Sequence, residues 1–500
     1  MIIPQNVIET LAYGARYVLV ALALLTLADI ILCALGTSLR AWTYRRRLKQ
    51  AEQNERPMPP PPPEKRSHSV GRGLAAMSAF CAISLVLLAL GQPDGIDIMG
   101  LMLAAALPAM VVFSTLFLRK TAPQADMALV LSVGFLCMLG VVVQYRLRPD
   151  TALRQFAFYG AGTVVLLVAS MVTAKIRTFF KLRWLLIVGG LGLLALAVVF
   201  GDWTYGARNW LAIGQWFSFQ PSEFVKPALV LVLAVYLGRY KRLLSLWPTA
   251  LFLAGCVGLL ILQRDLGATV QYIIAAVALF YAATSNLFLV ACGAVAAAGG
   301  AVVSYKLFAH VRVRVSAWQN PWAAIEDGGY QIVQGLMAIG SGGFFGLGLN
   351  NGTPKSIPAY HTDYVFAVIC EEFGLVVGIA VLAVYAVIIV RGAAIALKAK
   401  NREFALIALG GTIIIAFQAF LIVGGVIKLI PLTGVTLPFI SYGGSSILAC
   451  MAMVGMMLGA GQRAPEADAP PPDPLDGWDD DAPTKALIKG VMAGFEEDDA

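Results

Sequence analysis

Runs of about twenty apolar residues recur along most of this chain, and they constrain its fold more than any other feature. A helix of that length spans the roughly 30 Å hydrocarbon core of a bilayer. The runs lack the strict alternation of a transmembrane β-barrel strand. Hydrophobic residues make up 59% of the 500 residues and charged residues only 13%. The sequence therefore predicts an all-α polytopic membrane protein, because helices satisfy every backbone group within lipid.

The apolar runs predict thirteen membrane-spanning segments. The first does not read as a cleavable signal, since its basic residues follow the apolar run instead of preceding it. Lys and Arg clusters follow the first, third, fifth, seventh and eleventh segments, which assigns that side to the cytoplasm, with the N-terminus outside and the C-terminus inside. The predicted segments are 16–38, 73–92, 97–118, 126–146, 152–174, 179–200, 222–238, 246–263, 267–284, 286–306, 364–391, 404–426 and 442–462.

Two polar segments are predicted to be disordered. Residues 45–72 combine basic clusters with a polyproline run, which is typical of a stiff cytoplasmic linker. Residues 464–500 hold eleven acidic residues and two lysines, so the rest of the chain is strongly basic and suits anionic lipid or a phosphate-bearing substrate. A short amphipathic stretch in this tail is either solvated or a docking helix for a partner. Basic residues fringe the helices without forming one face, so no nucleic-acid partner is expected.

All seven cysteines lie within apolar segments and lack the spacing of a metal site. We interpret them as small buried hydrophobic residues. They are Cys33, Cys81, Cys137, Cys256, Cys292, Cys370 and Cys450.

Charged residues at the outer ends of the predicted helices are the candidates for function. Glu223 and Lys226 lie at i, i+3 on one helical face, where they either pair locally or contact a substrate. Asp265 lies between two apolar runs, in a tight turn or lining a cavity. The long outer segments 201–221 and 307–362 read as functional loops.

Asp363 follows His361 and Thr362 at the border between a polar loop and an apolar run. In a helix that begins near residue 362, Glu371 lies on the same face, roughly 12 Å further along. Asp363 is therefore either a helix cap or a general base at the water boundary. Further on, residues 431–446 interrupt an apolar region with prolines and glycines, which predicts an irregular re-entrant element.

Five sequence blocks, in order, resemble the SEDS family (shape, elongation, division and sporulation) of the FtsW/RodA/SpoVE type. They are ARNWLAIGQWFSFQPSEFVK, QRDLGAT, GGYQIVQGLMAIGSGGFFGLGL, HTDYVFAVICEEFG and IPLTGVTLPFISYGGSS. The resemblance divides the chain into an extra N-terminal transmembrane helix (1–44), the basic linker (45–72), two extra transmembrane helices (73–120), a ten-helix catalytic core (121–463) and the acidic cytoplasmic tail (464–500).

The resemblance implies a peptidoglycan glycosyltransferase of the bacterial cytoplasmic membrane. Such an enzyme polymerises lipid II at the outer membrane face with a class B penicillin-binding protein, for cell elongation, division or sporulation. It implies a divalent cation, Mg or Mn, whose ligands are not assigned. Asp363 matches the catalytic aspartate. The residues expected to bind substrate or line the cavity are Arg208, Trp210, Gln220, Ser222, Glu223, Lys226, Asp265, His361, Thr362 and Glu371, with Arg208 and Lys226 facing the leaving pyrophosphate.

Two departures from the family pattern keep other functions open. Ala359 stands where a glutamate is common, and Leu347 where a lysine is common. These departures motivate a non-catalytic scaffold for a transpeptidase as one alternative. A lipid II flippase is the other alternative, although the ionisable groups cluster at the outer mouth instead of spreading through the membrane.

Overall fold

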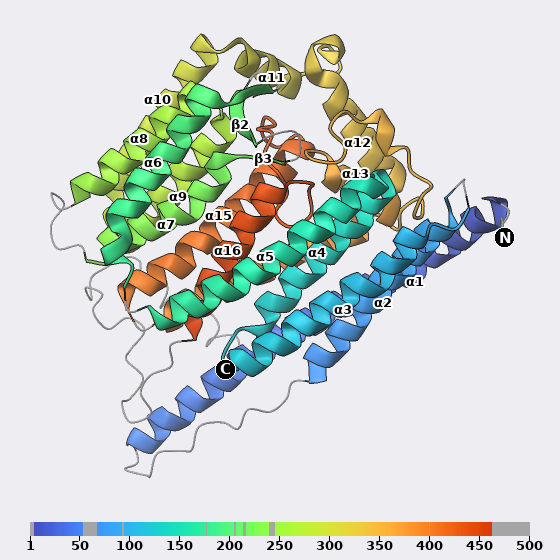
Figure 1. The fold of residues 1–500 in the computed structure, drawn as a ribbon, viewed down its shortest axis with the longest axis horizontal. Helices are drawn as coiled ribbons and strands as arrows, with labels where there is room; N and C mark the ends of the chain where they lie inside the picture. Colours follow the sequence, from blue (N-terminus) through green and yellow to red (C-terminus); the bar gives the residue numbers. More distant parts are fainter. Residues whose placement is uncertain are drawn as a thin grey trace. The chain divides into compact units, whose positions relative to one another are not determined.

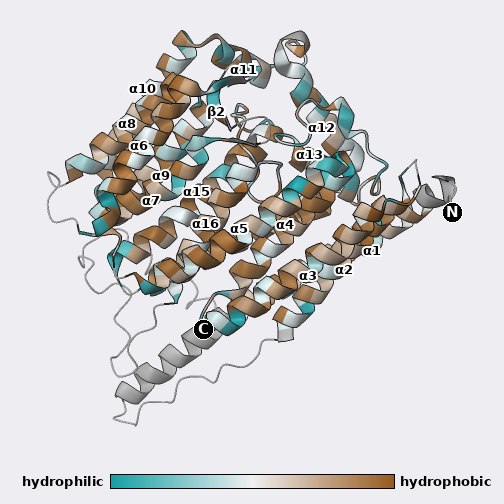
Figure 2. Ribbon diagram, in the orientation of Figure 1, coloured by the Kyte–Doolittle hydropathy of each residue, from teal (hydrophilic) through white to brown (hydrophobic). Residues whose placement is uncertain are grey.

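The computed structural model describes residues 5–53, 68–92, 95–176, 178–204, 207–213, 217–239, 246–399 and 401–462. Most of these residues lie in helices (Figure 1), which are apolar along most of their length (Figure 2). The helices of the first half are α1 (Gln5–Gln53), α2 (His68–Leu90), α3 (Ile98–Thr121), α4 (Met127–Leu147), α5 (Pro149–Lys175), η1 (Phe180–Leu182), α6 (Arg183–Phe200) and α7 (Pro221–Leu237). Those of the second half are α8 (Trp247–Leu262), α9 (Leu266–Thr284), α10 (Leu287–Leu307), α11 (Ala309–Gln319), η3 (Ile325–Gly329), α12 (Tyr330–Gly342), η4 (Pro354–Ser356), α13 (Val365–Phe373), α14 (Leu375–Lys398), α15 (Arg402–Val426) and α16 (Gly444–Gly461).

The predicted all-α membrane fold is confirmed. Within the described part of the chain, eleven helices are long and apolar enough to cross a membrane. Two further predicted spans form the shorter helices α7 and α8, of 17 and 16 residues. Helix α1 extends to Gln53 and α2 begins at His68, so both helices run into the predicted linker. Residues 54–67 of that linker and the tail 464–500 lie outside the described residues.

The span predicted over 364–391 is wrong, because the chain breaks at Gly374 between α13 and α14. Gly374 has a φ of 88°, which favours glycine. A side chain there would also collide with the carbonyl of Phe344. The membrane-spanning part of this region is therefore α14 alone, and α13 forms a separate short helix before it.

The two long segments predicted to be outer loops contain regular structure. Residues 201–221 form a three-stranded antiparallel sheet in the order β1 (Asp202–Thr204), β2 (Ala207–Ile213) and β3 (Phe217–Phe219). Residues 307–362 include α11, η3, α12 and η4. The irregular element predicted over 431–446 is confirmed, since no helix forms between Lys428 and Gly443.

The chain divides into two compact units, each with its own core. Unit 1 comprises residues 1–157, 334–391 and 439–442, and unit 2 comprises 158–333, 392–438 and 443–500. Helix α4 is almost wholly buried in unit 1, where Phe80 packs on Phe135 and Phe373 at ring distances of 5.9 and 5.6 Å. Helices α7, α15 and α16 supply most of the buried core of unit 2.

Polar contacts within unit 1 fix the three N-terminal helices α1–α3. Arg72 of α2 pairs with the buried Asp29 of α1 at 2.7 Å. Asp97, at the start of α3, accepts a 2.5 Å hydrogen bond from the Tyr145 hydroxyl of α4. Arg391 of α14 donates to the Ala34 carbonyl of α1 at 3.1 Å. The three helices therefore belong to the core of this unit and are not a separate bundle.

Candidate functional site

Asp363 lies on a tight turn in unit 1, immediately before α13. The carbonyl of Ala359 accepts the backbone N–H groups of Thr362 and Asp363 at 3.1 Å and of Tyr364 at 3.3 Å. Ala359 has a φ of 55°, an uncommon conformation for a residue with a side chain. One strained residue therefore closes the turn that carries the candidate base.

The helix predicted to begin near residue 362 begins instead at Val365. Tyr364, and not Asp363, occupies the N-cap position of α13, and its side chain makes no capping hydrogen bond. Asp363 and Glu371 consequently do not share one helical face. Asp363 is half-buried and lies one residue before this N-cap position.

Neighbouring segments hold the turn through its main chain. The carbonyl of His361 accepts from Gln144 Nε2 at 2.9 Å and from the backbone N–H of Tyr442 at 3.2 Å. The Ser441 hydroxyl donates to the Thr362 carbonyl at 2.6 Å. Because these donors come from α4 and from segment 439–442, three separate parts of unit 1 meet at the turn.

The surroundings of His361 disfavour a positive charge on its imidazole. Burial, followed by the positive charge of Arg148, lowers the pKa of His361 below its ordinary value of 6.5. Its Nδ1 is buried without a hydrogen-bond partner, and its ring contacts that of Tyr360 at 5.2 Å between centroids.

Glu371 and Glu372, near the end of α13, are both buried. Arg146 pairs with Glu372 at 2.7 Å, yet burial outweighs this cation and raises the pKa of Glu372 to about 7. One oxygen of Glu371 accepts from the Thr353 backbone N–H at 3.0 Å, and the other is buried without a hydrogen bond. Glu371, predicted to line the cavity, is therefore largely enclosed by protein.

A cavity of about 650 Å³ opens in unit 1 beside the same turn. Its cationic lining residues are Arg148, Arg154 and Lys355, against one acid, Asp150. Tyr360, three residues before Asp363, also lines it and receives a 3.3 Å hydrogen bond from Arg148. Sequence analysis singled out none of these three cations, although basic residues on the predicted outer side, against the positive-inside pattern, were the available signal.

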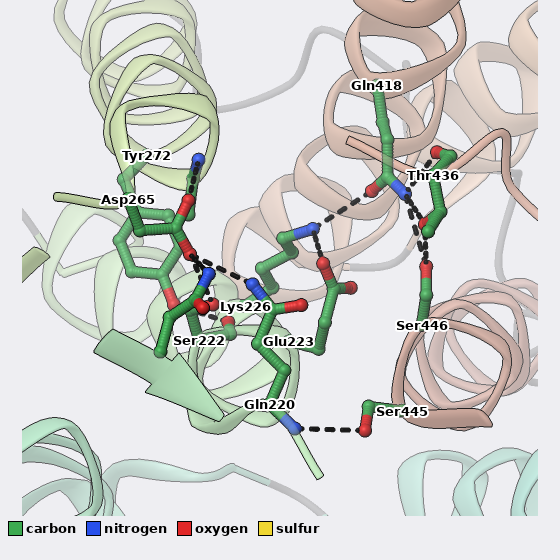
Figure 3. A network of polar contacts seen from close by, with 12 residues as sticks. Gln220, Ser222, Glu223, Lys226, Asp265, Tyr272, Gln418, Thr436, Ser445 and Ser446 are labelled. Carbon is green, nitrogen blue, oxygen red and sulfur yellow. Dashed lines mark hydrogen bonds and ion pairs between the residues drawn. The ribbon is translucent and has the colours of Figure 1, made fainter. Parts of the chain in front are cut away.

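Unit 2 holds the other predicted residues, and five of them, Gln220, Ser222, Glu223, Lys226 and Asp265, belong to one polar network (Figure 3). Asp265 accepts hydrogen bonds through one oxygen from Asn209, Gln220 and Ser222, at 3.1, 2.9 and 3.1 Å. Its other oxygen caps α9 by accepting from the Ala268 backbone N–H at 3.0 Å. The structure therefore brings Gln220, Ser222 and Asp265 together, with Asp265 at the centre.

The predicted ion pair between Glu223 and Lys226 is confirmed, with 2.7 Å between Lys226 Nζ and Glu223 Oε1. Lys226 is fully buried and also donates to Gln418 Oε1 of α15 at 3.0 Å. Gln418 in turn donates to the Thr436 carbonyl at 2.9 Å and to Ser446 at 3.2 Å (Figure 3). Sequence reasoning missed Gln418, although a lone amide within an apolar helix was a usable signal.

Arg208 and Trp210 lie on β2. The Arg208 guanidinium donates to the carbonyls of Gly201 and Val199 at 2.8 and 2.7 Å, so it satisfies the C-terminal end of α6. Trp210 pairs with Asp202 across the first two strands and is half-buried. The predicted role of Arg208 as a cation for a leaving group competes with these backbone contacts.

No cluster of three or more His, Cys, Asp or Glu side chains able to hold a metal ion occurs among the described residues. The cysteines do not form such a cluster either, and six of the seven are buried, as predicted, whereas Cys292 is exposed. A divalent cation at the turn would thus need oxygen ligands from a bound substrate, which is how Mg²⁺ commonly binds beside one or two carboxylates.

Comparison with known proteins identifies the family. The model of the FtsW/RodA/SpoVE cell cycle proteins matches residues 124–464. The peptidoglycan glycosyltransferase RodA of Mycobacterium tuberculosis is 35% identical over 392 residues, which cover 71% of this chain and 83% of that protein. The stage V sporulation protein E of Bacillus subtilis is 33% identical over 361 residues, covering 68% of this chain and 97% of that protein.

A solved structure described as coordinating polymerization and crosslinking in a peptidoglycan synthase complex matches with a TM-score of 0.57 and 29% identity, covering 67% of this chain and 97% of the matched chain. With a family model that matches well over half of its length, the chain belongs to the FtsW/RodA/SpoVE family of multi-pass membrane proteins.

Proposed function

We propose that this chain is a peptidoglycan glycosyltransferase that polymerises lipid II into glycan strands at the outer face of the cytoplasmic membrane. The observation that carries the proposal is the turn 359–364, which holds Asp363 outside α13 and whose Tyr360 lines a cavity with three cationic side chains. The curated relatives named as peptidoglycan glycosyltransferases support the reaction class.

Asp363 acts in this proposal as the general base. Its carboxylate takes the proton from the 4-hydroxyl of the acceptor sugar as that oxygen attacks the anomeric carbon of the donor. A new glycosidic C–O bond forms, the bond from the anomeric carbon to the lipid pyrophosphate breaks, and the electron pair leaves with the pyrophosphate. A second protein carboxylate is not required, because pyrophosphate leaves without being protonated.

Cations that face the leaving group stabilise its charge in the transition state. Within unit 2, Arg208 already donates to two backbone carbonyls, and Lys226 already pairs with Glu223. Arg148, Arg154 and Lys355 line an open cavity next to the turn. We therefore assign the pyrophosphate to these three residues in place of Arg208 and Lys226.

A divalent cation, Mg²⁺ or Mn²⁺, fits beside the turn of Asp363 only if oxygens of the bound pyrophosphate complete its coordination. Asp363 and Asp150, which lines the cavity, are the protein carboxylates that would hold it, because Glu371 and Glu372 are buried. When bound, such an ion supplies charge neutralisation of the pyrophosphate.

The orientation proposed for the membrane places the N-terminus outside and the C-terminus in the cytoplasm. Near its N-terminal end, α1 contacts the glycine-rich loop 343–353, because Arg16 donates to the Gly346 carbonyl. Further along, the Ala34 carbonyl of α1 accepts from Arg391, near the basic end of α14. Eighteen helical residues separate these contacts, about 27 Å, which is close to the hydrocarbon thickness. This span and the basic clusters support the orientation.

A class B penicillin-binding protein is the partner we propose, since the matched solved structure is that of a complex that polymerises and crosslinks peptidoglycan. Such a partner would cross-link the strands that this chain makes.

The experiment supplies purified lipid II to the full-length protein together with its penicillin-binding partner, and glycan strands are resolved by gel. Wild-type protein is expected to yield polymer, and the Asp363→Ala variant none, with both proteins equally monodisperse. Undiminished polymer from the Asp363→Ala variant would refute the assignment.

Lipid II flipping is the second candidate, favoured by the fully buried Lys226 and its network among the helices of unit 2. A liposome translocation assay on Asp363→Ala and Lys226→Met separates the two activities. Flipping per folded molecule that survives in the Asp363 variant but stops in the Lys226 variant would favour transport by unit 2.

A further inference from the structure

The first transmembrane helix, α1, lies outside the segment matched by the family model, yet it contacts the glycine-rich loop of residues 343–353, which lies within that segment. Arg16 Nη1 donates to the Gly346 carbonyl at 3.0 Å, and Tyr17 packs on Phe345 with 5.6 Å between ring centroids. A Cβ added at Gly348 would lie 3.2 Å from the Ala12 carbonyl oxygen. One face of the outer end of α1 therefore lies directly on residues 345–348.

The Arg16 guanidinium is held in place on the α1 side as well. Its central carbon lies 3.7 Å from the ring centroid of Tyr13 and 4.6 Å from that of Tyr17. Its Nη2 donates to the Tyr17 hydroxyl at 2.7 Å. Cation–π stacking against two rings leaves the guanidinium few orientations, so its bond to the loop is directional.

The same loop binds the end of α13 that carries the two buried carboxylates. The backbone N–H of Leu347 donates to the Glu371 carbonyl at 2.9 Å, and that of Gly348 donates to the Glu372 carbonyl at 3.1 Å. Gly346 has a φ of 80° and lies against the Glu372 carbonyl, so only glycine fits there. The loop thus caps the C-terminus of α13 at these glutamates.

From the carboxylates the contacts continue to the turn. Glu372 pairs with Arg146 of α4, and Gln144, two residues earlier, donates to the His361 carbonyl. Helix α13 itself begins two residues after Asp363. A shift of the loop would therefore reach the turn along both α13 and α4.

We propose that Arg16 is a positioning residue, through which the extra helix α1 fixes the 343–353 loop, and with it α13 and the turn of Asp363, for catalysis. This inference rests on the proposed glycosyltransferase function. It gives a role to a segment that the family match does not include.

Helix α1 has separate attachments at its other end, which makes the role of Arg16 testable. Arg72 pairs with Asp29, and Arg391 donates to the Ala34 carbonyl. Loss of Arg16 should consequently leave α1 docked while releasing the loop.

The test measures lipid II polymerisation and amide hydrogen exchange of residues 343–353 in the full-length protein with its partner. A misplacement of about 1 Å at a catalytic site can cost two orders of magnitude in rate. Because Arg16→Ala should release the loop only partly, we expect a roughly tenfold lower kcat, with KM unchanged within about twofold. Exchange of the Leu347 and Gly348 amides should rise about tenfold, because their hydrogen bonds open locally. Arg16→Lys, which keeps one charged donor, should recover most of both losses.

Two control variants, one in α1 and one in a residue that pairs with α1, leave the loop contacts intact. Leu25→Ala alters an exposed apolar position that is 49% accessible. Arg72→Gln removes the ion pair with Asp29. Both should retain wild-type kcat and wild-type amide protection at 343–353.

Wild-type kcat together with wild-type protection in Arg16→Ala would overturn the inference. An equal loss of both in Arg72→Gln would also overturn it, because general loosening of α1 would then explain the effect. If the wild-type protein made no polymer, the proposed function would fail, whereas the exchange arm would still report whether Arg16 positions the loop.

Discussion

The polar network of unit 2 and the turn of unit 1 use hydrogen bonds in opposite ways. In unit 2, the carboxylate of Asp265 receives four donors from the protein itself. In unit 1, the bonds that hold the turn go to main-chain carbonyls of Ala359, His361 and Thr362. A side chain that is saturated by its own fold stabilises structure, whereas a turn fixed through its backbone can present a side chain to a substrate.

We therefore expect polar substitutions in the network of unit 2 to lower the free energy of unfolding more than substitutions at the turn of unit 1. Lys226→Met is expected to destabilise the protein by about 3–5 kcal/mol, because it leaves the buried carboxylate of Glu223 without its cation. Thermal unfolding in detergent measures the change. The double variant Glu223→Gln/Lys226→Met should recover part of the loss, and equal stability of the single variant and the wild type would contradict the buried pair.

In unit 1 the sensitive feature is backbone geometry. Gly346→Ala should destabilise by about 2–3 kcal/mol, because a strained left-handed residue also meets the Glu372 carbonyl. Gly343→Ala is the matched control: its φ is 54°, but nothing lies within 4 Å of an added Cβ. A smaller loss in the control separates steric contact from strain, and equal losses would mean that the carbonyl contact does not matter.

Relief of strain at the turn should have a smaller effect. Ala359→Gly is expected to stabilise the protein by about 0.5 kcal/mol, since glycine adopts the φ of 55° freely but loses more entropy on folding. Chemical denaturation measures this change. If Ala359→Gly lowered the free energy of unfolding by more than the extra backbone entropy that glycine loses on folding, that result would contradict a left-handed conformation at residue 359.

The smallest predicted effect is a pH dependence from His361. Its pKa is lower in the folded protein than the ordinary 6.5, so the folded state binds fewer protons and stability is lost as pH falls through 6.5. Unfolding midpoints at pH 7.5 and 5.5 should differ less in His361→Asn than in the wild type. The difference between the two proteins removes the contribution of His310, whose pKa is also lowered. An identical change of the unfolding midpoint with pH in both proteins would exclude His361 as a source of the pH dependence.

Features set by local sequence were predictable, and those set by distant contacts were not. Apolar run length identified most membrane spans, and the i, i+3 spacing identified the Glu223–Lys226 pair. The break at Gly374 was missed because glycine is common within apolar helices and its partner, Phe344, lies thirty residues earlier.

The candidate site shows the same limit. The position of Asp363 at a polar border was visible in the sequence, but the start of α13 depends on a left-handed Ala359, which no propensity favours. The partners of Glu372 and Lys226 are Arg146 and Gln418, at separations of 226 and 192 residues. Such pairings follow from tertiary packing and leave no local pattern.

The most direct test of this account compares Asp363→Asn with Asp265→Asn in one assay of lipid II polymerisation per folded molecule. Asparagine preserves shape and removes the charge in both variants. We expect that Asp363→Asn makes no polymer per folded molecule, whereas Asp265→Asn unfolds at a lower temperature and its folded fraction still polymerises. Polymer from Asp363→Asn at the wild-type rate would contradict it.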